Sequence, residues 1–375
     1  MRIGIPAEIR PGETRVAGTP ETVKKMAQGG LHTVYVQAGA GAHANYPDAD
    51  YAAAGATIVP TAADVFSQSD IILKVRGPET SEIALLRPGV ILACLLATLE
   101  PERLEALART GAAAFRLESI PRITRAQAMD VLSSQGNIAG YKAVIVAADE
   151  YGRYMPMLMT AAGTVKAARV LILGAGVAGL QAIATAKRLG AVVEAFDVRP
   201  AVKEQVESLG AKFVEVPISD EEKKAAETSG GYAREMSDDY KRRQAALIDE
   251  RARAADIVIT TALIPGRAAP TLITEETVKA MKPGSVIVDL AVKQGGNCPL
   301  SELDRVVTKH GVKIVGHGTL PALVPTDASA MYARNLLHFF NLLVDPKTGE
   351  LKLDRSDEII AGALVCADGA LLGGK

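Results

Sequence analysis

The chain has 375 residues, which corresponds to two or three domains at roughly 150 residues per domain. Its 42 Lys and Arg residues balance 43 Asp and Glu residues, and the net charge of −1 excludes a general attraction to nucleic acid or to an anionic membrane. The hydrophobic fraction of 48% and the charged fraction of 23% are those of a globular protein and exclude global disorder.

Short runs of Val, Ile and Leu alternate with amphipathic stretches, which is typical of βαβ units and a parallel sheet. The N-terminal part contains such runs at residues 3–5, 33–36, 71–75 and 90–95. The middle of the chain contains them at residues 169–173, 192–196, 213–216, 257–259, 286–288 and 312–315, enough for a complete doubly wound domain. We therefore expect an α/β protein with two Rossmann-like, doubly wound parallel-sheet domains.

Two pairs of similar segments suggest that the domains arose by duplication. SDIILK at residues 69–74 is similar to ADIVIT at 255–260, and RPGVIL at 87–92 is similar to KPGSVI at 282–287. Because Pro-Gly commonly precedes a strand, chance similarity is the alternative.

Two long helices are expected to join the domains around a hinged cleft. Ile138, Tyr141, Ile145 and Ala148 recur at the spacing of one helix face, and residues 331–343 also have a helical pattern. The first domain would comprise residues 1–135 and about 321–375, and the second about 136–320. Residues 219–253 are densely charged, and we expect two solvated helical pieces flanking a mobile loop at residues 229–232, with a solvated excursion without function as the alternative.

Several classes of site and location are disfavoured. The first residues contain no signal-peptide core, and the longest apolar run, residues 89–97, is shorter than the roughly 20 residues that a spanning helix needs. The three cysteines lie far apart, which fits a reducing compartment, and the histidines have no metal-binding spacing. We expect no metal site and no direct membrane insertion. Cys298 is expected to be a neutral thiol in a turn, and His317 to be packed or exposed rather than to act near a cofactor.

A glycine motif follows the predicted strand 169–173 and opens a helix. Gly174 would permit the tight turn, Gly176 would let the backbone approach a pyrophosphate, and Gly179 would let the helix pack close to the sheet. Asp197 ends the next strand, where a carboxylate accepts hydrogen bonds from adenosine ribose hydroxyls and repels a 2′-phosphate. NAD(H) is therefore favoured, although Arg199 leaves NADP(H) as an alternative.

A polar segment precedes the first long helix. Gln127, Asp130 and Ser133 recur at a spacing of three, and Arg122 and Arg125 add cations. Such a set can orient a nicotinamide carboxamide, its ribose and a phosphate, but it lacks a His for acid–base chemistry. A capped, salt-bridged loop is the alternative.

Several segments together resemble one family across nearly the whole chain, the NAD(H)-binding alpha subunits (domain I) of proton-translocating nicotinamide nucleotide transhydrogenases. They are GAGVAGLQAIATAKRLGAVV from residue 174, DVR at 197–199, PRITRAQAMDVLSSQ at 121–135, GGYAREM at 230–236, MTAAGT at 159–164, TTALIPG at 260–266 and VDLAVKQGGNCPLSE at 288–302.

This resemblance implies a homodimer that binds NAD(H) and exchanges hydride with NADP(H) held on a partner subunit, while membrane-spanning partners couple transfer to proton movement. The chain would be cytoplasmic and peripheral on the inner face of the cell membrane, in the split-subunit form. The implied nicotinamide-positioning residues are Arg122, Gln127, Asp130 and Ser133. The implied cofactor-binding residues are Gly174, Gly176, Val177, Gly179, Asp197, Val198, Arg199, Gly231, Tyr232, Gln244 and Leu263. Direct transfer between two nicotinamides needs orientation rather than a proton donor, which fits the missing His.

Alanine dehydrogenase is the nearest alternative, since it resembles the chain at residues 3–9 and at the glycine motif. Arg15 and Lys74 stand where that family holds pyruvate, but Leu95 replaces its acid–base His and Lys293 replaces an Asp. Leucine cannot transfer a proton, so this activity is disfavoured and Arg15 and Lys74 are expected to be structural. A non-enzymatic NAD-binding subunit is a further alternative, which the polar segment and the 230–232 loop disfavour.

Overall fold

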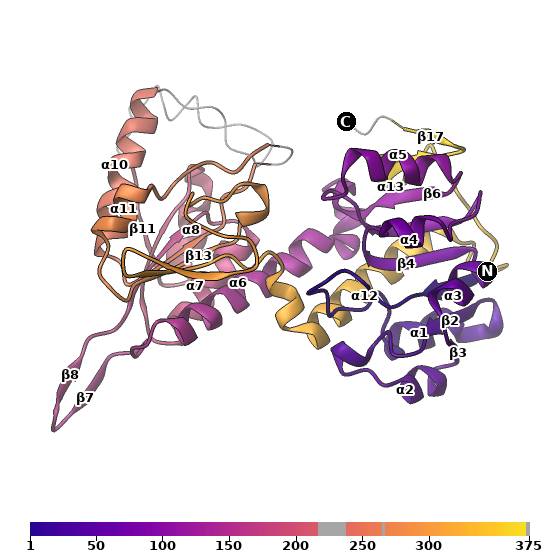
Figure 1. Cartoon of the computed structure of the whole chain (residues 1–375), viewed down its shortest axis with the longest axis horizontal. Helices are drawn as coiled ribbons and strands as arrows, with labels where there is room; N and C mark the ends of the chain where they lie inside the picture. Colours follow the sequence, from indigo (N-terminus) through magenta and orange to yellow (C-terminus); the bar gives the residue numbers. More distant parts are fainter. Residues whose placement is uncertain (217–237, 265–266, 373–375) are drawn as a thin grey trace. The chain divides into compact units, whose positions relative to one another are not determined.

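A computed structural model describes residues 1–216, 238–264 and 267–372 (Figure 1). The chain forms two compact units, one of Met1–Gln135 with Pro321–Lys375 and the other of Gly136–Leu320. Each unit contains one large sheet dominated by parallel strands, which confirms the predicted α/β class. Within the described residues, no helix is both long enough and apolar enough to cross a membrane.

The first unit is built on an eight-stranded sheet with the order β17-β16-β6-β5-β4-β1-β2-β3. Its strands are β1 (Arg2–Ile5), β2 (Thr33–Gln37), β3 (Ala56–Val59), β4 (Ile71–Arg76), β5 (Ile91–Leu95), β6 (Ala113–Arg116), β16 (Leu364–Ala367) and β17 (Ala370–Leu371). Strands β1 to β6 are parallel in the 3-2-1-4-5-6 order of a doubly wound fold. The four predicted N-terminal strands are confirmed as β1, β2, β4 and β5, whereas β3 and β6 lacked an apolar run long enough to indicate them.

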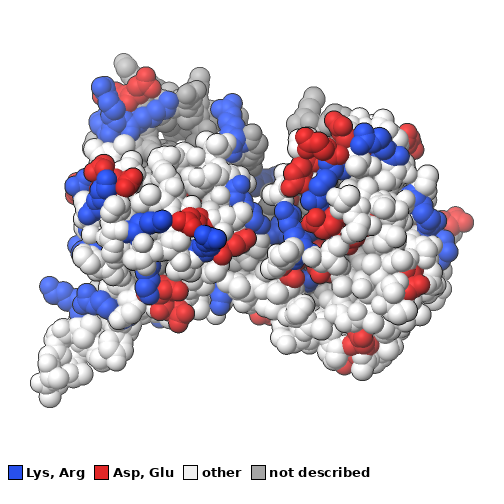
Figure 2. Space-filling view, viewed as in Figure 1, with Lys and Arg blue, Asp and Glu red and all other residues white. Residues whose placement is uncertain are grey.

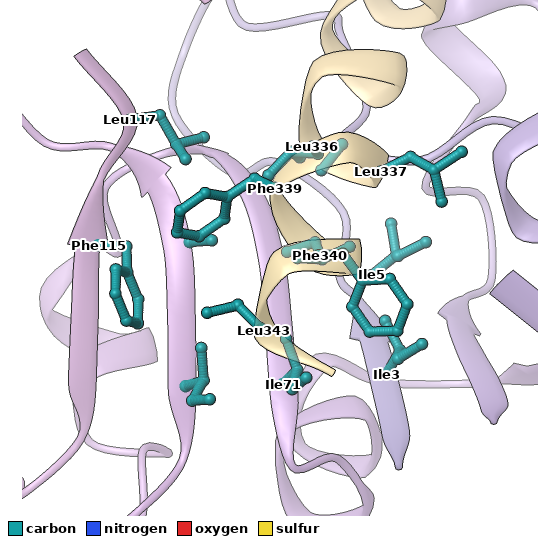
Figure 3. Close-up of a cluster of buried hydrophobic side chains, with 14 of the residues drawn as sticks. Ile3, Ile5, Ile71, Phe115, Leu117, Leu336, Leu337, Phe339, Phe340 and Leu343 are labelled. Atoms are coloured by element: carbon teal, nitrogen blue, oxygen red, sulfur yellow. The ribbon is translucent and has the colours of Figure 1, made fainter. Parts of the chain in front are cut away.

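The C-terminal helix α12 (Pro325–Leu343) supplies much of the core of the first unit. Its residues Leu336, Phe339 and Phe340 face side chains of the central strands, among them Ile3 and Phe115 (Figure 3). The rings of Phe115 and Phe339 meet edge to face with centroids 5.2 Å apart. The other helices of this unit are α1 (Pro20–Ala27), α2 (Asp48–Ala53), α3 (Ala62–Gln68), α4 (Thr80–Ile83), α5 (Pro101–Arg109) and α13 (Glu358–Ala363). The helical pattern predicted at residues 331–343 is therefore confirmed, and it exists to bury this apolar face.

The second unit has a seven-stranded sheet with the order β11-β10-β9-β12-β13-β15-β14. Its strands are β9 (Arg169–Leu173), β10 (Val192–Phe196), β11 (Lys212–Phe213), β12 (Ile257–Thr260), β13 (Val286–Asp289), β14 (Val306–Lys309) and β15 (Val312–Val315). All six predicted strands occur in the 3-2-1-4-5-6 order, although β11 is shorter than predicted. The antiparallel β14 was not predicted; it is joined to β15 by His310 and Gly311, which both have positive φ, as a two-residue hairpin turn requires.

The helix α6 (Val131–Glu150) confirms the helix predicted before the second domain, but the predicted face was wrong. Ala143, Val144 and Ala147 are buried, whereas Tyr141 is 42% exposed. A Cβ added at Gly140 would lie 2.0 Å from the Ala178 carbonyl oxygen, so the backbones of α6 and α7 are in close contact there. Small residues therefore define the packed face. The remaining helices of this unit are α7 (Val177–Arg188), α8 (Lys203–Ser208), α10 (Asp238–Ala254) and α11 (Glu275–Ala280).

The similar segments of the two halves occupy equivalent places in the two sheets, at strands four and five of each order. In the first unit, the Arg2 N–H donates to Asp70 Oδ2 at 3.0 Å. In the second unit, the Arg169 N–H donates to Asp256 Oδ2 at 2.8 Å. The turns before strand five also match, with hydrogen bonds from Gly89 N to Gly111 O at 2.9 Å and from Gly284 N to Gly311 O at 2.8 Å. Equal contacts at equivalent positions favour duplication over chance.

Candidate nucleotide-binding site

The three glycines of the motif have three different environments in the second unit. Gly174 has a φ of 103°, a conformation that glycine adopts without strain. A Cβ at Gly179 would lie 1.8 Å from the Gly174 carbonyl oxygen, whereas a Cβ at Gly176 would meet nothing within 4 Å. Gly174 therefore makes the turn, Gly179 allows the helix to approach the strand, and Gly176 leaves open space beside the backbone.

The N-terminus of α7 offers donors for an anion. Gly176 is its N-cap and has no side chain, so the first turn of the helix is not capped by a hydrogen bond from its own N-cap residue. The first backbone N–H groups of a helix lack partners within the helix, and the helix dipole adds partial positive charge there. Together with the open space at Gly176, these donors fit the pyrophosphate of a dinucleotide.

The carboxylate of Asp197 lies directly beside this turn. Asp197 follows the last residue of β10, and its Oδ2 accepts a hydrogen bond from the Ala175 N–H at 2.7 Å. Its two oxygens also accept hydrogen bonds from the side chain of Arg199, from Nε at 2.9 Å and from Nη2 at 2.8 Å. The predicted acid is thus placed at the glycine turn, and the predicted cation is paired with it.

A loop after β12 contacts the other side of the turn, and sequence reasoning did not assign its residues a role. Asn297 Nδ2 donates to the carbonyl oxygens of Ala262 at 2.9 Å and Pro270 at 2.8 Å, so it joins both ends of this loop. Asp289 is buried and holds the Asn297 segment through the Cys298 N–H at 3.1 Å. The TTALIPG and QGGNCP segments entered only through the resemblance, because their contacts with each other are long-range.

The other predicted cofactor-binding residues differ in what the structure says of them. Val177 opens α7 and is 40% exposed, Leu263 follows β12 and is 46% exposed, and Val198 is half-buried between Asp197 and Arg199. Gln244 lies half-buried in α10, and no hydrogen bond between described residues joins it to the glycine turn. Gly231 and Tyr232 lie outside the described residues.

The predicted polar segment belongs to the first unit, in the short helix η4 (Thr124–Met129) and the start of α6. Arg122 and Gln127 are exposed. Asp130 accepts hydrogen bonds from the Ser133 N–H at 2.9 Å and from its hydroxyl at 2.6 Å, which makes it a cap for α6. Arg125 binds Asp357 through both Nη atoms, at 2.7 and 3.0 Å, so this cation anchors the segment to the start of α13. The segment thus contains a capped part and an exposed polar part.

The two cations shared with alanine dehydrogenases are buried and ion-paired. Arg15 donates to both carboxylate oxygens of Glu13, at 2.7 and 2.6 Å. Lys74 Nζ lies 2.7 Å from Glu82 and 3.4 Å from Glu8. Burial opposes ionisation of Glu13, but the charge and hydrogen bonds of Arg15 outweigh it and lower the pKa of Glu13 to about 2. The expectation that Arg15 and Lys74 are structural is supported by these pairings.

The thiol of Cys298 is inert in this structure. Cys298 is fully buried, and its burial raises the pKa of the thiol. A protonated thiol is a poor nucleophile, so the prediction of a neutral thiol is confirmed. Among residues 1–216, 238–264 and 267–372, no group of three or more His, Cys, Asp or Glu side chains is placed to hold a metal ion.

Two family models together match nearly the whole chain. The alanine dehydrogenase/PNT N-terminal domain matches residues 4–139, and the alanine dehydrogenase/PNT C-terminal domain matches residues 143–373. The chain belongs to the alanine dehydrogenase/PNT family. This membership confirms the family indicated by the sequence segments.

Within the family, relatives named as transhydrogenases are more similar to this chain than those named as alanine dehydrogenases. The chain is 54% identical over 378 residues to an NAD(P) transhydrogenase subunit alpha from Rhodospirillum rubrum, covering 99% of this chain and 98% of the relative. A crystal structure of transhydrogenase from Sinorhizobium meliloti has a TM-score of 0.89 at 48% identity, covering 99% of this chain and 100% of that one. The alanine dehydrogenase of Mycobacterium tuberculosis is 32% identical over 383 residues, covering 99% of this chain and 95% of the relative.

Proposed function

We propose that the chain is the NAD(H)-binding subunit of a proton-translocating transhydrogenase, in which hydride passes directly between NADH and NADP+ held on a partner subunit. The observation that carries this proposal is the uncapped helix N-terminus at Gly176, beside the carboxylate of Asp197. When bound, NADH supplies the hydride. The glycine turn binds the pyrophosphate and Asp197 binds the adenosine ribose.

The residues of the first unit support transfer without a protein acid or base. Leu95, at the end of β5, has no group that can exchange a proton. Arg15 and Lys74 are occupied by carboxylates of their own chain. We assign Arg122, Gln127, Asp130 and Ser133 to positioning the nicotinamide end, a role that requires orientation and exclusion of water rather than proton transfer.

The proposed assembly is a homodimer with NADP(H)-binding and membrane-spanning partner subunits, located on the cytoplasmic side of the cell membrane. The hairpin of β7 (Leu158–Thr160) and β8 (Gly163–Val165) supports the homodimer. Residues 154–165 contain no charged side chain, and Tyr154, Met157 and Met159 are 59%, 61% and 71% exposed. Figure 2 shows this hairpin as an arm of the second unit without charge along its length. We assign it to the contact with a second copy of the chain, because methionine and tyrosine are enriched where chains associate.

The experiment that tests the proposal compares the purified chain with and without its NADP(H)-binding partner. NADH binding is measured by titration, and hydride transfer by the absorbance change of an NADP+ analogue. We expect binding in both samples and transfer only when the partner is present. Turnover of NADH with pyruvate and ammonium by the chain alone would instead identify an alanine dehydrogenase.

A variant separates the enzyme from a non-enzymatic NAD-binding subunit. Gln127 is exposed and lies in the first unit, outside the glycine turn. Gln127→Ala is therefore expected to retain NADH binding and to lose most of the hydride transfer. Unchanged transfer by this variant would contradict the role assigned to the polar segment.

A further inference from the structure

The hydrogen-bonding capacity of Asp197 is fully used by its own chain. Oδ1 accepts hydrogen bonds from the Arg199 N–H and from Arg199 Nε, both at 2.9 Å. Oδ2 accepts hydrogen bonds from the Ala175 N–H at 2.7 Å and from Arg199 Nη2 at 2.8 Å. An ionised carboxylate has about four acceptor positions. Ribose hydroxyls can therefore reach this carboxylate only in exchange for a hydrogen bond that it already makes.

The contacts of the Arg199 side chain are the ones that can be exchanged. The N–H groups of Ala175 and Arg199 belong to the backbone of the turn and of the segment after β10, whereas the guanidinium ends a flexible side chain that is 31% exposed. Asp197 is 9% exposed, and a carboxylate buried to this degree is costly without a cation. Arg199 thus stabilises the acid that selects the nucleotide.

We propose that Arg199 is a specificity-determining residue, in which a latent site for a 2′-phosphate is held closed by Asp197. This inference rests on the proposed function, since it concerns the same nucleotide site. A guanidinium is always charged, and its planar fork matches the oxygens of a phosphate as well as those of a carboxylate. In this chain the fork is turned onto Asp197, and the pair presents no net positive charge to a nucleotide.

The consequence is that one substitution exposes a preference that two substitutions abolish. Asp197→Ser removes the carboxylate that repels a 2′-phosphate and releases Nε and Nη2 of Arg199. The released guanidinium can then bind the phosphate. If relief of repulsion alone acted, Arg199 would make no difference to the gain.

The test measures dissociation constants of the wild-type chain, Asp197→Ser, Asp197→Ser/Arg199→Ala and Asp197→Ser/Lys203→Ala for NADH, NADPH and adenosine 2′,5′-bisphosphate. Lys203 is a matched control, because it is a nearby cation whose Nζ is paired with Glu215 at 2.8 Å. Asp197→Ser is expected to bind NADPH and the bisphosphate about tenfold more tightly than the wild type, the size of one charge-assisted contact. The gain is expected to persist with Lys203→Ala and to disappear with Arg199→Ala.

Equal affinity of Asp197→Ser and Asp197→Ser/Arg199→Ala for the bisphosphate would overturn the proposal. If the Ser variant fails to fold, Asp197→Asn, which keeps the shape of the side chain, replaces it in each comparison. Failure of the wild-type chain to bind NADH would contradict the proposed function instead. The bisphosphate lacks a nicotinamide and reports on Arg199 separately, so the two failures are distinguishable.

Discussion

The hydroxyl of Thr261 donates a hydrogen bond to the carbonyl oxygen of Gly174 at 3.0 Å. Thr261 follows β12, and a Cβ placed on Gly174 would lie 2.5 Å from its Oγ1. The first glycine of the turn is therefore held in place by a residue far along the chain. The position of the pyrophosphate-binding N–H groups depends on this contact.

We predict that Thr261→Val raises the dissociation constant of NADH by about tenfold, because the isosteric side chain leaves the Gly174 carbonyl without its partner and loosens the turn. Thr261→Ser retains the hydroxyl and is expected to bind NADH as the wild type does. Fluorescence titration with NADH measures both. Equal loss of affinity in the two variants would show that the methyl group, and not the hydrogen bond, is what matters.

Two glycines of the motif are predicted to fail in different ways. Gly179→Ala places a Cβ 1.8 Å from the Gly174 carbonyl oxygen, so the second unit is expected to lose about 1–3 kcal/mol of stability. Gly176→Ala places its Cβ in open space, so stability is expected to be unchanged while NADH binding is lost to steric conflict with the pyrophosphate. Thermal unfolding and NADH titration separate the two outcomes. Normal NADH affinity in Gly176→Ala would contradict the placement of the pyrophosphate.

The buried pair of Arg15 and Glu13 predicts a dependence of stability on pH. The pKa of Glu13 is lowered from 4.5 to about 2, so its contribution is complete above pH 4.5 and is lost as the pH falls towards 2. Glu13→Gln leaves Arg15 buried without its carboxylate and is expected to cost about 3–5 kcal/mol near neutral pH. The difference between variant and wild type, measured by urea unfolding, should shrink between pH 4.5 and 2.

A surface ion pair provides the control for this measurement. Glu21 pairs with Arg334 at 2.6 Å, but the two side chains are 43% and 54% exposed. Solvent screens such a pair, so Glu21→Gln is expected to cost about 1 kcal/mol or less. A cost for Glu13→Gln no larger than that of Glu21→Gln would contradict the assignment of the Arg15 cluster to structural stabilisation.

The uncharged hairpin is predicted to be needed for the homodimer. Met159 is 71% exposed, so Met159→Asp should leave the fold intact and place a charge in the proposed contact. We expect the wild-type chain to sediment as a dimer of 39.3-kDa chains and the variant as a monomer. Leu303→Asp is the matched control, since Leu303 is 51% exposed but lies away from the hairpin in sequence. A dimeric Met159→Asp chain would exclude the hairpin from the interface.

The agreement between sequence and structure is best where the pattern is local. The strands at residues 169–173, 192–196 and 312–315 were predicted to the residue, because each is a continuous apolar run flanked by turn residues. The glycine turn and Asp197 were predicted for the same reason, since their chemistry follows from their spacing after a strand. The face of α6 was wrong, because small residues and not the larger apolar ones make its contact with α7.

Local pattern could not show which distant groups meet. Whether Arg199 faces a phosphate or a carboxylate, whether Arg15 and Lys74 are open to a substrate, and which residue supports Gly174 all depend on side chains brought together by the order of the strands. Thr261 and Gly174 are neighbours because β12 pairs with β9 and not with the strand before it in the chain. Alternating hydrophobicity is encoded residue by residue and is legible in the sequence, whereas a pairing of charges or hydroxyls across a sheet exists only once the chain has closed the intervening loop.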